Sequence, residues 1–86
     1  MTKREKIKRE LAQIELITHA EKLGFRKDHW GNWKHTEKQA RIKLNPNKVR
    51  FELKDSWGWH RYYSIGYNKL PNVITEAKRY LESMIL

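Results

Sequence analysis

The chain predicts an α+β domain, in which an antiparallel meander of three to four strands is flanked by an N-terminal and a C-terminal helix (α-β-β-β-β-α). Three observations support this prediction. Apolar residues recur every three or four positions near both ends of the 86-residue chain, which is the helical period. In the middle they alternate with polar residues, which is the period of a half-buried strand. Gly, Asn and Pro residues separate the alternating runs as turns. A chain of this length forms one domain, residues 1–86.

The first helix is predicted to run from about Lys3 to about Leu23. Thr2 and Glu5 have the T-x-x-E spacing of a capping box. Gly24 is suited to end the helix because it adopts positive φ without a steric cost. The apolar positions that we expect to face the core are Ile7, Leu11, Ile14, Ile17 and then Ala20 or Leu23.

The clearest hairpin spans residues 40–54. Apolar and charged residues alternate on both sides of a turn at residues 45–47, where Pro46 suits turn position i+1. The predicted inner face holds Ala40, Ile42, Leu44, Val49, Phe51 and Leu53. The predicted outer face holds Arg41, Lys43, Lys48, Arg50 and Lys54, with Glu52 as the only acid. The hairpin therefore has one apolar face and one basic face.

Shorter strands are predicted around this hairpin, at 25–28, 33–36 and about 59–65. Strict alternation in the last strand puts Trp59, Arg61, Tyr63 and Ile65 on one side and His60, Tyr62 and Ser64 on the other. Trp33 and Trp59 occupy strand positions, so we expect them in the core. Trp30 and Trp57 occupy turn positions, so we expect them to be exposed.

The final helix is predicted to begin near Pro71, because the missing N–H of proline is harmless in a first turn. Its apolar stripe consists of Val73, Ile74, Ala77, Leu81, Met84 and Ile85. Two helices with apolar stripes need one apolar sheet face to cover. We therefore expect both helices on the same face, with the basic face in water.

Positive charge and aromatic rings are concentrated in the middle of the chain. Residues 22–69 contain twelve Lys/Arg and four Asp/Glu, a net charge of +8 out of +9 for the whole chain. The same stretch contains all four Trp, both Phe and three of the four Tyr. Solubility alone does not require charge gathered beside rings, whereas a phosphate backbone with exposed bases favours both. We therefore expect an acidic partner: DNA, RNA, a nucleoprotein complex or an acidic protein surface.

The predicted nucleic-acid contacts are of two kinds. The side chains expected to contact phosphates are Arg41, Lys43, Lys48, Arg50, Lys54 and Arg61. The rings expected to stack on bases or enter a groove are Trp30, Trp57 and Tyr62. The sequence leaves open whether the target is DNA or RNA, which nucleotide sequence it has, and the oligomeric state of the protein.

The predicted element order is similar to that of the double-stranded RNA-binding domain, which runs α-β-β-β-α. Residues 73–77 depart from that family, because their only charge is Glu76 where the family has a lysine-rich run. A three-stranded sheet followed by a helix also resembles the plant AP2 and phage-integrase arm-binding domains. The turn at residues 30–33 and the strand end at residues 63–66 are similar to that group. This resemblance implies a sheet that enters the DNA major groove.

The sequence does not predict an enzyme, a cofactor or a metal site. It contains no Cys, which excludes disulfides and thiolate catalysis and fits a reducing compartment, so we expect the cytoplasm. The four His lack a metal-ligand spacing, and no paired-carboxylate motif or glycine-rich phosphate loop is present. The longest apolar run is far shorter than the roughly 18 residues needed to span a membrane.

Two rival functions stay open at this point. Small basic α+β proteins rich in Lys, Asn and Ile are typical of phages and mobile elements. Such a protein can also act as an inhibitor or adaptor that binds a host nuclease or a CRISPR effector, with exposed Trp residues as hot spots. A small ribonuclease toxin that uses His60 with a Lys or Arg is the second rival.

Overall fold

A computed structural model describes residues 2–86 and confirms the α+β fold. The elements are α1 (Lys3–Lys22), β1 (Phe25–Lys27), β2 (Trp33–His35), β3 (Ala40–Leu44), β4 (Lys48–Asp55), β5 (Gly58–Gly66), the 3₁₀ turn η1 (Leu70–Val73) and α2 (Ile74–Ser83). The strands form one antiparallel sheet in the order β1-β2-β3-β4-β5. The sheet has five strands instead of three to four, because β1 and β2 pair with each other and extend its edge.

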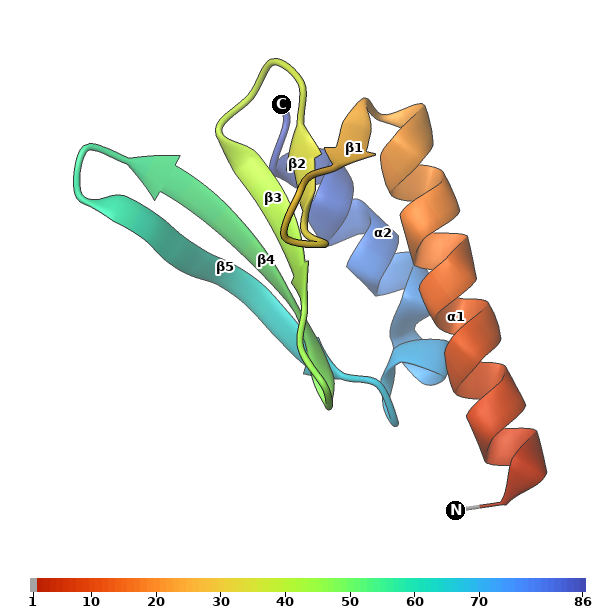
Figure 1. Ribbon diagram of the computed structural model, residues 1–86. Coiled ribbons are helices and arrows are strands. Elements are labelled where there is room, and N and C mark those ends of the chain that lie inside the picture. Colours follow the sequence, from red (N-terminus) through yellow and green to blue (C-terminus); the bar gives the residue numbers. More distant parts are fainter. Residues whose placement is uncertain (1) are drawn as a thin grey trace.

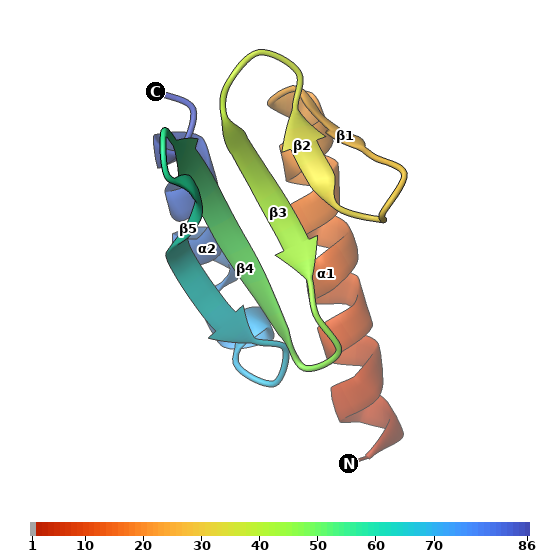
Figure 2. The ribbon, with the colours of Figure 1, turned by 60° about the vertical axis from the view of Figure 1, so that its left-hand side comes forward.

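Both helices cover the same face of the sheet (Figure 1). The view in Figure 2 shows α1 behind β2 and β3, and α2 behind β4 and β5. In Figure 1 the β4–β5 hairpin curves away from the helices, so its tip stands clear of them. The opposite face of the sheet carries neither helix, as the amphipathic patterns predicted.

The core lies between the sheet and the helices. Register places Ile42 opposite Phe51, and Phe51 opposite Tyr63, across the three central strands. From α2, Ala77 and Leu81 are fully buried against this layer, as the stripe of the last helix predicted. Tyr63 stacks on Tyr80 of α2, with ring centroids 4.0 Å apart. Burial, with smaller effects of Glu76 and Tyr80, raises the pKa of Tyr63 above the ordinary value of 10.0.

The predicted core stripe of α1 is wrong in its first half, whereas Ala20 and Leu23 at its end do pack in the core, as predicted. The buried residues are Ala12, Leu16 and Ala20, four positions apart. Three of the predicted positions instead face solvent, with Ile7 55%, Leu11 59% and Ile14 62% exposed. The physical reason is that α1 has apolar residues on two sides, and the side with two small alanines lets the helix approach its neighbours more closely than three bulky aliphatic side chains would.

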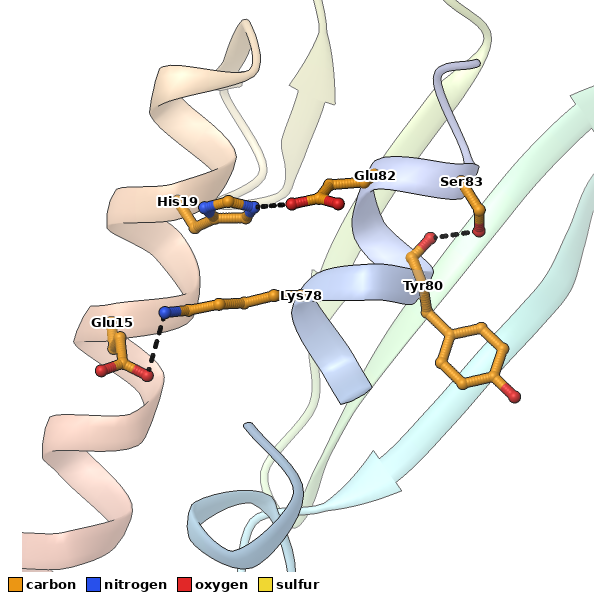
Figure 3. A network of polar contacts seen from close by, with 6 residues as sticks. All are labelled: Glu15, His19, Lys78, Tyr80, Glu82 and Ser83. Atoms are coloured by element: carbon orange, nitrogen blue, oxygen red, sulfur yellow. Dashed lines mark hydrogen bonds and ion pairs between the residues drawn. The ribbon is translucent and has the colours of Figure 1, made fainter. Parts of the chain in front are cut away.

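Polar contacts join the two helices along their length (Figure 3). Lys78 Nζ lies 3.3 Å from a carboxylate oxygen of Glu15, and His19 Nε2 lies 2.9 Å from Glu82 Oε1.

None of the helices in the described residues 2–86 combines the length and apolar character that a bilayer-spanning segment needs.

The turn between α1 and β1 is built around Gly24 and His35. Gly24 has a φ of +103°, and a Cβ at this position would lie 2.9 Å from His35 Nε2. His35 is buried, and its Nε2 lies 2.7 Å from the carbonyl oxygen of Leu23. Its Nδ1 accepts hydrogen bonds from the backbone amides of Glu37 and Lys38. Nε2 must then carry the proton, and this neutral tautomer ties the end of α1 to the β2–β3 loop.

A β-bulge in β5 overturns the predicted alternation of that strand. Phe51 pairs with Tyr63 and Glu52 pairs with Arg61, so Tyr62 is the extra residue. Both Tyr62 and Tyr63 consequently lie on the helix side, where each ring contacts Tyr80. The prediction that Arg61 shares a side with Tyr63 is therefore wrong. The bulge returns Arg61 to the outer face.

Candidate nucleic-acid interface

Seven basic side chains of β2–β5 share the outer face of the sheet. The strand register pairs Lys34 with Arg41 and Lys43 with Arg50. It also pairs Arg61 of β5 with Glu52 of β4. The full set, which we call the basic face, is Lys34, Arg41, Lys43, Lys48, Arg50, Lys54 and Arg61. All six cations predicted from the sequence lie on it. Lys34 was missed, although its position between Trp33 and His35 in a strand was a usable signal.

Glu52 is the only acid among the outer-facing residues of β2–β5, and it is buried beneath two arginines. Its side chain is 6% exposed. Arg41 Nε donates to Glu52 Oε1 at 2.7 Å, and Arg50 contacts Glu52 Oε2 at 3.3 Å. The carboxylate therefore holds two guanidinium groups in place while it is itself hidden from solvent. With seven cations and this one carboxylate, the basic face has a net charge of +6 (7 − 1).

Trp59 also lies on the basic face, contrary to the prediction that it belongs to the core. Register pairs it with Lys54, and the guanidinium carbon of Arg41 lies 4.2 Å from its ring centroid. Lys54 Nζ lies 5.9 Å from the same centroid. The bulge at Tyr62 explains the error, since it reverses the side of every residue between the bulge and the hairpin turn. Trp33 does pack against the core, as predicted.

Two tryptophans are exposed in turns, as predicted. Trp30 is 81% exposed in the β1–β2 turn, and Trp57 is 88% exposed in the β4–β5 turn. Because β2 and β4 run parallel to each other, the turn before β2 and the turn after β4 lie at opposite ends of the sheet. The two rings therefore flank the basic face at its ends and do not lie within it.

Tyr62 does not lie on the basic face, so the sequence placed it on the wrong side. Its hydroxyl lies 2.7 Å from Ser83 Oγ of α2. It lines an open hollow of about 390 Å³ at the free edge of β5, together with Leu53, Lys54, Asp55, His60 and Arg61. Tyr62 is therefore removed from the set of residues that can contact a ligand bound flat on the sheet.

Asp55 and His60 form a polar pair at the tip of the β4–β5 hairpin. Asp55 Oδ1 lies 2.9 Å from His60 Nε2 and accepts a hydrogen bond from the Trp57 amide at 2.7 Å. The hydrogen bond from the Trp57 amide, helped by His60, lowers the pKa of Asp55 below 3.8. Both side chains of the pair are more than half exposed. The pair fixes the turn that carries the exposed Trp57 ring.

Within residues 2–86, no group of three or more His, Asp or Glu side chains is arranged to hold a metal ion. Comparison of the chain with protein families, with curated proteins and with solved structures finds no match.

Proposed function

We propose that this protein is a non-enzymatic nucleic-acid-binding protein that docks its basic face on the phosphate backbone. The single observation that carries the proposal is the burial of Glu52 beneath Arg41 and Arg50. Seven cations of β2–β5 share one side of the sheet, and the only acid among the outer-facing residues of these strands is hidden from solvent. Like charges so close repel one another across strands, so an anion that binds there relieves the repulsion.

The arrangement favours a duplex over a single strand. A surface that binds single strands needs exposed rings beside its cations, so that bases can stack on them. The ring that lies on the basic face is Trp59, near the hairpin end of β5, and Arg41 covers it. Trp30 and Trp57 stand at the ends of the sheet, where they can meet a groove or a flanking backbone segment. Function in the cytoplasm, in a phage or mobile element, is part of this proposal and suits the cysteine-free composition.

The direct test is fluorescence anisotropy with random-sequence duplex DNA, duplex RNA and single strands over a range of salt concentrations. We expect the logarithm of the duplex association constant to fall with the logarithm of salt with a slope of about −5. This slope corresponds to five or six neutralised phosphates. A slope near zero, or no binding even at low salt, would contradict the proposal.

The rival functions give different results in the same experiment. An inhibitor or adaptor that recognises a host protein would not bind free nucleic acid at low salt, yet would bind an acidic protein surface or a nucleoprotein complex. A ribonuclease that used His60 with its Asp55 partner would degrade total RNA during long incubation. Intact RNA together with salt-sensitive duplex binding would leave the proposed function as the one supported.

Replacing Glu52 with Gln should lower stability and raise affinity in one variant. The two guanidinium groups lose their counter-charge, so we expect the free energy of unfolding to fall by about 2 kcal/mol. The basic face gains one unit of net charge, so we expect duplex binding to tighten about fivefold. Chemical denaturation and anisotropy measure the two effects.

Glu37→Gln is the matched control, because it removes the same charge from an exposed position in the β2–β3 loop. It should leave stability unchanged and affect binding less than twofold. A Glu52→Gln protein as stable as the wild type would show that the carboxylate does not organise the arginines.

A further inference from the structure

The outward side of α1 is apolar although nothing in the described chain covers it. Ile7, Leu11 and Ile14 are each more than half exposed and follow one another at spacings of four and three. Thr18 continues the same row one turn later, and Arg4 and Glu21 occupy its two ends. We call these six residues the α1 stripe. It lies on the side of the helix opposite the buried row Ala12, Leu16 and Ala20.

The first two turns of α1 bury little surface against the rest of the described chain, and the contacts become closer from Arg9, whose guanidinium carbon lies 6.0 Å from the Tyr67 ring centroid. All of residues 2–8 are exposed, and the first buried residue is Ala12. Both Figure 1 and Figure 2 show these first turns extending past the sheet. Such a helix end is only marginally stable in water, because its backbone is ordered with little burial of apolar surface. A partner on the stripe would supply that burial.

The charges of α1 favour a second copy of the same helix in the opposite direction. Residues 3–10 contain five Lys/Arg and two Glu, whereas residues 11–22 contain two Glu and one Lys. The helix is therefore basic in its first half and slightly acidic in its second. Only an antiparallel copy places each basic half beside an acidic half, whereas a parallel copy places halves of the same charge beside each other.

The stripe has the four-three spacing of a coiled-coil seam, which fixes how two copies would meet. In the antiparallel register, Leu11 lies against the partner's Ile14, and Ile7 lies against the partner's Thr18. The same register sets Arg4 against the partner's Glu21 at both ends. The apolar contacts thus lie in the middle of the helix pair, and one ion pair lies at each end.

We infer that the protein forms a symmetric dimer in which two copies of α1 pack antiparallel through the α1 stripe. The stripe lies opposite the buried row of α1, and three of its residues, Ile14, Thr18 and Glu21, line an open hollow that Trp33 and Leu44 of the sheet also border. Because α1 covers the other face of the sheet, contact through the stripe leaves the basic face uncovered in both subunits. The inference is therefore independent of the proposed nucleic-acid binding. It is tested in the absence of any nucleic acid.

Analytical ultracentrifugation of the 10.5 kDa chain over a wide concentration range is the test. We expect a monomer–dimer equilibrium whose dissociation constant rises about hundredfold in Leu11→Lys, since both copies lose a central apolar contact. Leu86→Lys is the matched control, because Leu86 is 98% exposed outside the stripe. Leu11 is exposed in the monomer, so Leu11→Lys should keep the wild-type circular dichroism spectrum.

A charge swap tests the direction of the two helices. Arg4→Glu alone and Glu21→Arg alone should each weaken the dimer several-fold, and the double variant should restore it. A protein that sediments only as a monomer at every concentration, or a Leu11→Lys variant that dimerises as tightly as the wild type, would overturn the inference. A double variant weaker than both single variants would overturn the antiparallel arrangement.

Discussion

Replacing Lys34, Lys43 and Lys54 together with Glu should lower the affinity for duplex DNA about a thousandfold at constant salt. These three lysines are exposed and belong to three different strands of the basic face. Each substitution removes one phosphate contact and adds a repulsive charge, so the salt slope should fall in magnitude by about three. Fluorescence anisotropy over a salt series measures both quantities. The fold should survive, because none of the three side chains is buried.

The control for this variant changes the net charge by the same six units elsewhere on the surface. Lys27, Lys38 and Lys69 are exposed residues outside the basic face, and replacing all three with Glu should weaken binding less than tenfold. If the two triple variants lose the same affinity, binding follows net charge alone and the basic face is not the docking surface.

Phe51→Ala should destabilise the domain by about 4 kcal/mol, the largest stability effect that we expect from a single substitution. Phe51 is fully buried in the central strand, pairs with Ile42 and Tyr63, and its ring centroid lies 5.4 Å from that of Tyr63. A domain of 86 residues has a total stability of roughly 4–13 kcal/mol, so the variant should be close to unfolding at room temperature. Urea denaturation followed by circular dichroism measures the loss.

Phe51→Leu separates the cavity from the loss of apolar character. It retains most of the buried volume, so we expect a cost of about 1.5 kcal/mol. Phe51 lies between Arg50 and Glu52 in β4, and these two neighbours point to the other side of the sheet. Equal denaturation midpoints for the Ala and Leu variants would show that the space around Phe51 collapses freely, which a close-packed core does not allow.

Binary patterning in β3 and β4 predicted the basic face because both strands keep a strict period of two. Arg41, Lys43 and Arg50 lie where alternation put them, since no residue interrupts the pairing of β3 with β4. The same rule failed in β5, where one extra residue at Tyr62 shifts the register. No residue type in this strand marks the position of the bulge, so the alternation of apolar and polar residues could not reveal it.

The α1 stripe misled prediction for a different physical reason. Size and hydrophobicity favoured Ile7, Leu11 and Ile14 as core residues, whereas close approach to the neighbouring elements favoured the row that begins at Ala12. Both patterns have helical spacing, and only the tertiary fold decides which one is inside. The burial of Glu52 was equally hidden from the sequence, because it depends on arginines from two strands closing over one carboxylate.

The absence of helices from one side of the sheet makes this chain suitable for directed evolution of new binding specificities. Side chains that point outward from β3 and β4 alternate with those that hold the domain together, so a display library can randomise Lys43, Lys48 and Lys54 while Ile42, Val49 and Phe51 are kept constant. Selection on such a library would explore recognition separately from folding.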